Sequence, residues 1–269
     1  MRYKLLTVKK KPVKQEVSNI KKFFNKLQFE EESHTYKVGE TPLTSVSATI
    51  GQYCNVFDTE SAAAHVARRR GMSPEAVKEM WEAKKEYACA KGHKVHLFGE
   101  KYTFDRSTPH TTEEDILPFE KAVVKFWGEL PEHIVPAMVE LQMYAVKYGI
   151  AGTSDILLYD KIRKGFIIAD YKTNEDLFKN YNKKLKGPFK DMVEMPYNKY
   201  QLQLSYYQIL FELSGHKVID RRIIWLLPDT TYKMYATGDF TTILKQELDA
   251  KQTNNTTYTV GLLEGDTVG

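Results

Sequence analysis

Three acidic residues recur at intervals of fifteen positions, and their surroundings restrict the fold more than any other feature. Asp155 and Asp170 lie within the short apolar segments 150–159 and 165–172, which are typical of β-strands. The polar, Gly-containing stretch between these segments suits a hairpin turn. Glu140 precedes Asp155 by the same interval. The spacing therefore predicts a three-stranded antiparallel meander.

The register of this meander follows from the centres of its turns. A turn centred between residues 162 and 163 places Asp155 opposite Asp170. A turn centred between residues 147 and 148 places Glu140 opposite Asp155. Neighbouring strands are about 5 Å apart, so the three carboxylates would form a row, unless a bulge turns one to the other face. Acids at strand ends facing water are the alternative, but strand interiors disfavour Asp, and this favours a functional role.

Lys172 follows Asp170 by two positions, which puts both side chains on the same face of a strand. Two carboxylates and an ammonium group on one patch of sheet are the minimum apparatus for metal-assisted hydrolysis of a phosphodiester. A simple salt bridge between Lys172 and Asp170 is the alternative, and it is compatible with the first role.

Several motifs resemble, in order and spacing, those of the PD-(D/E)XK nuclease superfamily in its RecB-like branch. They are Gly92–His96, Gly152–Asp155, Asp170–Thr173 and Gln203–Tyr207. Leu43–Ser47 also resembles a segment of phage-type and mitochondrial genome-maintenance exonucleases of that branch. Each motif alone is weak, and the combination spans most of the chain.

The resemblance implies an α/β fold with a central mixed β-sheet, flanking helices and an N-terminal helical elaboration. It implies that Asp155, Asp170 and Lys172 are catalytic. It also implies that a metal is bound by the two Asp carboxylates, the carbonyl group of Tyr171 and the side chain of His96. Oxygen ligands favour Mg²⁺ or Mn²⁺, and a His ligand tilts the preference toward Mn²⁺.

The choice of His96 leaves alternatives open. A lone His on a helix is more often a packing or surface residue than a ligand. His93 lies one turn before His96 and could replace it, while Glu100, one turn after, could orient its imidazole. Glu140 could bind a second metal ion or orient its water.

Substrate-binding residues are expected on a helix and on two polar segments. Gln203 and Tyr207 are one turn apart and share a helix face, and the resemblance places them beside the active site. Ser45 could contact a phosphate or cap the helix that begins there. Three lysines of a segment that interleaves cations with aromatic residues suit a nucleic-acid backbone, and an ordinary solvated loop is the alternative: Lys183, Lys184 and Lys186.

The 269 residues are expected to form a single domain. Its expected parts are a basic, irregular N-terminal segment with a short hairpin at residues 29–38, a helical region, an α/β core and a polar tail: 1–40, 41–130, 131–250 and 251–269. The remaining expected elements are helices over 58–102 with a break at 71–74, over 113–129, 197–213 and 240–250, and strands over 221–228 and 233–237.

The composition limits cofactor and compartment. No run of eighteen apolar residues exists, so no membrane span or membrane partner is expected, and the N-terminus lacks the features of a secretory signal. Cys54 and Cys89 are too few for an iron–sulfur cluster with four Cys ligands and suit a reducing compartment. We expect a cytoplasmic protein.

These features together predict a metal-dependent DNA exonuclease in recombination, repair or phage DNA processing. The expected partners are DNA, as single strands or duplex ends, and a recombination or single-strand-binding protein. A site- or structure-specific endonuclease on the same core is one alternative. The other is a DNA-binding protein with an inactive nuclease core, which the intact Asp155, Asp170 and Lys172 set disfavours.

Overall fold

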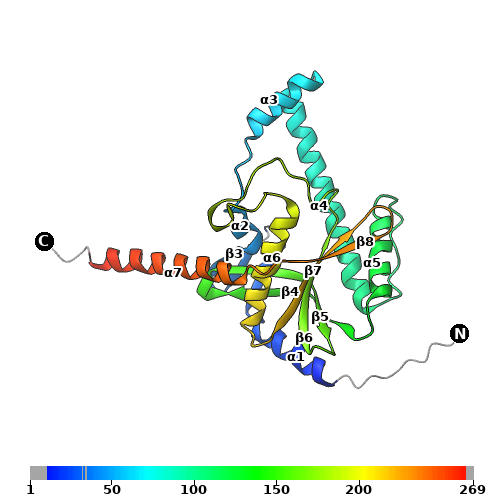
Figure 1. The fold of residues 1–269 in the computed structure, drawn as a ribbon, viewed down its shortest axis with the longest axis vertical. Coiled ribbons are helices and arrows are strands. Elements are labelled where there is room, and N and C mark those ends of the chain that lie inside the picture. Colours follow the sequence, from blue (N-terminus) through cyan, green and yellow to red (C-terminus); the bar gives the residue numbers. More distant parts are fainter. Residues whose placement is uncertain (1–10, 32, 34, 265–269) are drawn as a thin grey trace.

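A mixed eight-stranded sheet flanked by helices forms the centre of the molecule, as predicted (Figure 1). The computed structural model describes residues 11–31, 33 and 35–264, and within these ranges it describes side chains from residue 13 to residue 253. The strands are β1 Leu27–Glu30, β2 Thr35–Val38, β3 Thr41–Ser45, β4 Ile134–Ala145, β5 Ile150–Asp160, β6 Gly165–Lys172, β7 Val218–Leu226 and β8 Tyr232–Ala236. The α-helices are α1 Lys11–Phe23, α2 Val46–Gly51, α3 Thr59–Arg70, α4 Pro74–Phe104, α5 Leu117–Glu129, α6 Pro196–Glu212 and α7 Thr241–Glu264.

The strand order is β1-β2-β3-β5-β6-β7-β8, and β4 pairs with β5 outside this path. β3 runs parallel to β5, and β6 runs parallel to β7, whereas the other pairs are antiparallel. The β4–β5–β6 meander predicted from the spacing of the acids is therefore present. The expected hairpin near residues 29–38 is also confirmed by β1 and β2.

The predicted register of the meander is confirmed on both sides of β5. On one side, Ile156 pairs with Ala169. On the other side, Val139 pairs with Ile156 and Leu141 with Ser154, so Glu140 lies across from Asp155. The single bulge of β4 falls between Pro136 and Met138 and leaves this register unchanged.

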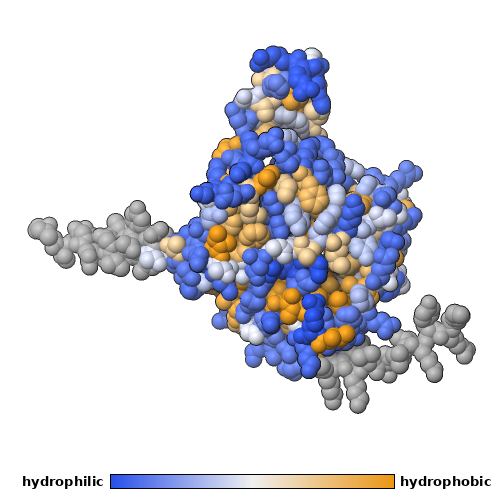
Figure 2. All heavy atoms as spheres, viewed as in Figure 1, coloured by the Kyte–Doolittle hydropathy of each residue, from blue (hydrophilic) through white to orange (hydrophobic). Residues whose placement is uncertain are grey.

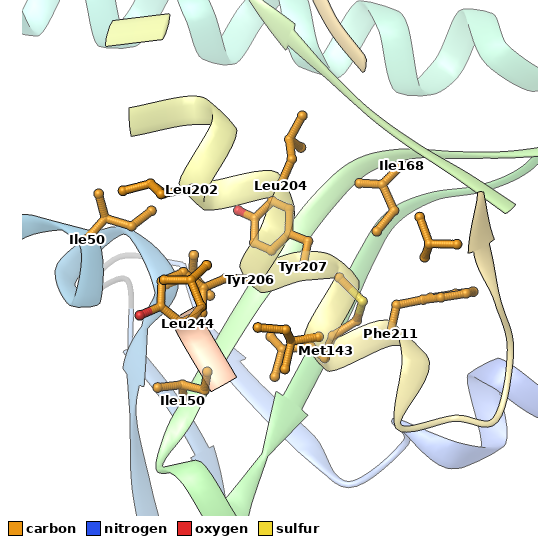
Figure 3. Close-up of a cluster of buried hydrophobic side chains, with 14 of the residues drawn as sticks. Ile50, Met143, Ile150, Ile168, Leu202, Leu204, Tyr206, Tyr207, Phe211 and Leu244 are labelled. Atoms are coloured by element: carbon orange, nitrogen blue, oxygen red, sulfur yellow. The ribbon is translucent and has the colours of Figure 1, made fainter. Parts of the chain in front are cut away.

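Apolar side chains fill the space on both faces of the sheet. α6 covers one face, where Leu204, Tyr206 and Phe211 are buried against side chains of the strands (Figure 3). α4 and α5 cover the other face, where Phe126 packs with residues of β5, β6 and β7. Burial of such side chains contributes roughly 1.5–3 kcal/mol each, which fixes the helices that bear the polar site.

α3 and the first half of α4 project from this body (Figure 1). α3 ends at Gly71 in the left-handed conformation (φ 66°), and α4 begins at Pro74, with the Ser73 hydroxyl accepting a hydrogen bond from the Ala76 amide. The predicted helix break is thus confirmed, and a glycine C-cap and a proline in the first turn mark its two sides. The projecting end is largely hydrophilic on its surface (Figure 2).

Two helical expectations at the ends of the chain were wrong. The basic N-terminal segment contains α1, whose Ile20 is buried in the core with the following Phe24. The last helix continues from Thr241 to Glu264, well beyond the expected end at residue 250. The first ten and last five residues lie outside the described part of the chain. None of the described helices combines the length and apolarity needed to cross a membrane.

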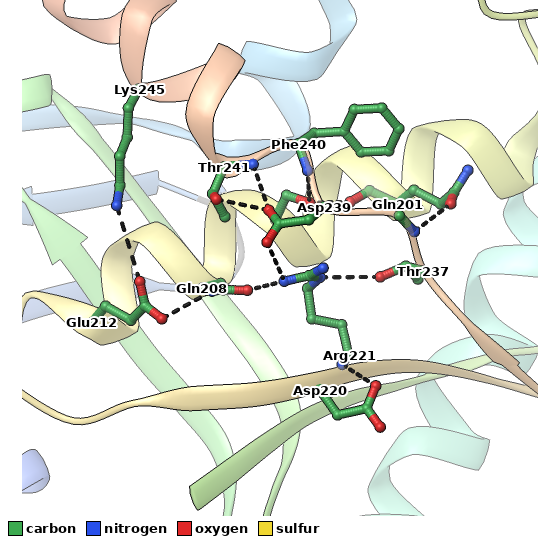
Figure 4. Close-up of polar contacts among 12 residues, drawn as sticks. Gln201, Gln208, Glu212, Asp220, Arg221, Thr237, Asp239, Phe240, Thr241 and Lys245 are labelled. Atoms are coloured by element: carbon green, nitrogen blue, oxygen red, sulfur yellow. Dashed lines mark hydrogen bonds and ion pairs between the residues drawn. The ribbon is translucent and has the colours of Figure 1, made fainter.

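A buried arginine fastens the C-terminal part of the fold to α6 (Figure 4). Arg221 of β7 donates through Nε to the Thr237 hydroxyl over 3.2 Å and through Nη1 to the side-chain oxygen of Gln208. Nη1 also lies 3.7 Å from the Asp239 carboxylate. The backbone amide of Phe240 donates to the Ser205 hydroxyl at 3.3 Å. We call Arg221, Gln208, Thr237 and Asp239 the arginine network.

Candidate metal centre

Asp155 lies where β5 and β6 separate. The backbone pairing of these strands ends at Ile156 and Ala169, one position short of Asp155 and Asp170. Beyond that point, a carboxylate oxygen of Asp155 accepts a hydrogen bond from the backbone amide of Tyr171 at 2.9 Å. The Asp155 side chain thus accepts a hydrogen bond from a backbone amide of β6 that no longer pairs with β5. This hydrogen bond fixes the orientation of the carboxylate.

α4 brings a histidine to this carboxylate. Nδ1 of His96 lies 3.2 Å from the same Asp155 oxygen. Gly99 allows the close approach, because a Cβ atom at this position would lie 2.7 Å from the ring of Tyr171. The Tyr171 hydroxyl accepts a hydrogen bond from the Trp127 indole at 2.9 Å, which holds the ring in place. His93, the alternative to His96, is largely exposed and lies 4.0 Å from Glu31.

Glu140 completes a group of three potential ligands. One ligand atom from each of His96, Glu140 and Asp155 lies within 4.8 Å of the others. Glu140 has a φ of 47°, an unusual backbone conformation for a residue with a side chain. Strained conformations of this kind cluster at functional sites, where the surrounding structure holds them.

Asp170 and Lys172 form a buried ion pair next to this group. The carboxylate of Asp170 is almost fully buried, and only 13% of the Lys172 side chain is exposed. The Lys172 ammonium also lies 4.3 Å from the centre of the Tyr200 ring. The predicted salt bridge is therefore present, and both charges remain on the wall of the same pocket as Asp155.

The pKa values of the cluster reflect competing burial and charge. Burial lowers the pKa of His96, but the neighbouring Asp155 carboxylate outweighs it and raises the value to about 9. Burial and the negative charge of Asp155 together raise the pKa of Asp170 to about 6. Partial desolvation in the pocket and repulsion from Asp155 raise the pKa of Glu140 to about 8, although this residue stays exposed on one side.

Asp155 differs from the other two acids. Burial acts to raise its pKa, but the positive charges of His96 and Lys172 and the Tyr171 amide outweigh this and hold the pKa below its ordinary value. Asp155 thus stays charged at the centre of the group, and its negative charge raises the pKa values of Glu140 and Asp170. A divalent cation would relieve that repulsion, and the oxygen and imidazole donors fit Mg²⁺ or Mn²⁺.

Gln203 and Tyr207 of α6 reach the same pocket. The Gln203 amide donates to the Tyr207 hydroxyl at 2.8 Å, and its buried Oε1 has no hydrogen-bond partner among the described side chains. Gly152 makes room for Tyr207, because a Cβ atom there would lie 2.7 Å from the ring. Tyr206, by contrast, is fully buried in the core, where its hydroxyl lies 3.2 Å from that of Tyr53.

The pocket has a volume of about 720 Å³ and brings most of the predicted residues together. Ser45 lines it and also caps α2 by accepting a hydrogen bond from the Ala48 amide at 3.1 Å, so both of its expected roles are geometrically available. Three predicted substrate-binding residues are exposed on the β6–α6 loop and do not line the pocket: Lys183, Lys184 and Lys186. The carbonyl group of Tyr171 stays a predicted ligand.

Sequence reasoning missed one wall of the pocket. Phe29 and Tyr36 of the β1–β2 hairpin line it together with Glu31 and with Gln142 of β4. The Tyr36 hydroxyl lies 3.0 Å from that of Thr153 on β5, which holds the hairpin beside the site. No local pattern in the sequence indicates this contact, because the residues are more than a hundred positions apart.

No known family model matches this chain, and no curated protein matches it at a significant level. The geometry of the site therefore carries the functional argument.

Proposed function

We propose that this protein is a metal-dependent nuclease that hydrolyses phosphodiester bonds of DNA. The observation that carries the proposal is the convergence of His96, Glu140 and Asp155 in one pocket with the Asp170–Lys172 ion pair. The order and spacing of the motifs, which resemble those of RecB-like PD-(D/E)XK nucleases, support it. Two free thiols suit a reducing compartment, and we infer a cytoplasmic location.

In the proposed hydrolysis, the acidic side chains and His96 bind the metal, and Lys172 acts on the water and the phosphoryl oxygens. Asp155, Asp170, Glu140 and His96 would hold Mg²⁺ or Mn²⁺, with the Tyr171 carbonyl group as a further ligand. The bound metal supplies Lewis-acid activation of the phosphodiester and of the attacking water. Lys172 keeps its proton, because the Asp170 and Asp155 carboxylates outweigh burial and raise its pKa. We infer that its ammonium group orients the water by hydrogen bonding and stabilises negative charge on the phosphoryl oxygens.

We propose attack from a DNA end. The site lies inside a pocket bounded by the β1–β2 hairpin, α4 and α6, which suits a single strand better than an intact duplex. The three loop lysines lie outside the pocket, and the backbone carbonyl of Lys184 accepts a hydrogen bond from Asn55 at 2.7 Å, which fixes the loop beside α2. The loop lysines would therefore contact the strand along its path, away from the scissile phosphate.

A covalently closed DNA circle and its linear form distinguish the modes of attack. With Mg²⁺ or Mn²⁺, we expect the linear form to be degraded to short oligonucleotides or mononucleotides, and the circle to persist. Rapid cutting of the circle would favour an endonuclease. Binding without cleavage of either form, with both metals, would favour an inactive nuclease core. Lys172→Met is the control, and it should bind DNA but not cleave it.

A further inference from the structure

A second pocket lies apart from the candidate metal centre. It has a volume of about 490 Å³ and shares no lining residue with the first pocket. Its walls come from the end of α1, the turn between β4 and β5, and the end of α6. The lining residues that carry the argument are Lys22, Phe23, Lys26, Val146, Lys147 and Leu213.

The pocket exposes large apolar side chains. Phe23, Val146 and Leu213 are 46%, 47% and 45% exposed, although each comes from a different element. Tyr144 and Tyr148 add two partly buried aromatic rings. Three apolar side chains from separate elements thus meet at one hollow and leave about half of their surface accessible to a ligand or partner.

All charged residues that line the pocket are lysines. Lys22 and Lys26 are exposed and form no ion pair with the described residues. Lys147 lies 3.4 Å from Asp249 of α7, but both side chains are more than half exposed, so solvent screens that pair. Lys22 and Lys26 therefore place two positive charges at the rim of the apolar floor, without an acidic partner among the described residues.

We propose that this pocket binds an acidic peptide segment of a partner protein that carries a phenylalanine or another large apolar side chain. The apolar residue would fill the hollow beside Phe23 and Leu213. Carboxylates of the peptide would pair with Lys22 and Lys26 at the rim, where charge complementarity provides specificity. A nucleic acid is the other occupant that the test distinguishes, because lysines beside aromatic rings can also contact phosphates and bases.

Fluorescence anisotropy with a labelled peptide tests the proposal. The probe contains five aspartates followed by a C-terminal phenylalanine, and the comparison peptide ends in alanine. The Lys22→Glu/Lys26→Glu variant should bind the probe at least about tenfold more weakly than the wild type, because rim charges repel the carboxylates. Phe23→Ala should weaken binding about fivefold or more, through loss of apolar contact.

The matched control is Lys14→Glu/Lys21→Glu. It makes the same charge change on the same helix, at exposed positions that do not line the pocket. This control should bind the probe within about twofold of the wild type. Circular dichroism melts establish that all variants fold, and Leu213→Ala serves as a second apolar variant.

Three outcomes would overturn the proposal. The first is equal weakening by both double variants, and the second is equal affinity for the two peptides. The third is displacement of the probe by a single-stranded oligonucleotide that itself loses affinity in Lys22→Glu/Lys26→Glu, which would assign the surface to nucleic acid. The measurement requires no cleavage activity, so its result is independent of the proposed function.

Discussion

The two sides of α6 face two polar clusters, the arginine network and the candidate metal centre, which differ in how their charges are compensated. Ser205 and Gln208 lie on the side of the arginine network, while Gln203 and Tyr207 lie on the side of the metal centre. In the arginine network, the guanidinium group of Arg221 meets neutral oxygens and one carboxylate. Among the described residues, this network contains no buried side-chain nitrogen or oxygen atom that lacks a hydrogen-bond partner.

The metal centre has an excess of like charge. Three carboxyl groups converge there with one imidazole and one ammonium group, and burial together with repulsion from Asp155 raises the pKa values of Asp170 and Glu140. Gln203 also keeps a buried oxygen without a described partner. The comparison indicates that one cluster is built for stability and the other retains unsatisfied groups for binding.

The largest expected effect is the loss of catalysis in Asp155→Asn. The amide keeps the shape of the carboxylate but removes the charge that attracts His96 and would bind the metal. We expect turnover of linear DNA to fall at least about 10³-fold, equivalent to roughly 4 kcal/mol in the activation barrier. Steady-state cleavage assays measure this fall. Near-normal turnover in a correctly folded variant would contradict the proposed role of the centre.

The matching change in the other cluster is Arg221→Met. It leaves the side-chain oxygen of Gln208 without its buried donor and removes the link to Thr237. We expect the free energy of unfolding to fall by about 3 kcal/mol. Urea denaturation measures this loss, and turnover per folded molecule should stay within about threefold of the wild type. A large loss of turnover with unchanged stability would contradict the structural role that we assign to the arginine network.

The sequence predicted the core of the site because the signals there are local. The fifteen-residue spacing of the acids and the centres of the turns between them determined the register, so Glu140 and Asp155 could be placed opposite each other. Helical spacing placed Gln203 beside Tyr207 in the same way. The left-handed backbone of Glu140 was not predictable, because tertiary contacts hold it.

Other parts of the structure depend on contacts between distant segments. The parallel pairing of Thr44 with Ile150 joins residues more than a hundred positions apart, and no local pattern indicates it. α1 did have a local signal, since Val13, Val17 and Ile20 recur at helical spacing. The cluster of lysines and Pro12 obscured that signal, although proline is well tolerated in the first turn of a helix.

The smallest predicted effect concerns the pH dependence of stability in metal-free protein. The pKa of Glu140 rises from its ordinary value of 4.5 to about 8 on folding, so the folded state keeps this proton to a higher pH than the unfolded state. The stability that this group contributes is fully present below pH 4.5 and is lost as the pH rises through 8. Glu140→Gln should therefore become more stable than the wild type as the pH rises.

Asp239 of the arginine network provides the matched control. Burial acts to raise its pKa, but hydrogen bonds from Thr241 and the charge of Arg221 outweigh it and lower the pKa below 3.8. Its contribution to stability is present above that pH and is lost only in more acidic solution. Asp239→Asn should thus shift the stability equally at pH 5 and pH 8, without changing the slope between them.

Urea denaturation in EDTA at intervals from pH 5 to pH 8 measures both slopes. Relative to the wild type, we expect Glu140→Gln to gain about 1 kcal/mol across this range, a value reduced from the full shift because the side chain faces an open pocket and is screened by solvent. Parallel curves for Glu140→Gln and the wild type would show that Glu140 carries no excess repulsion. In that case the arginine network and the candidate metal centre would differ in the ligands that they can bind and not in the repulsion between their charges.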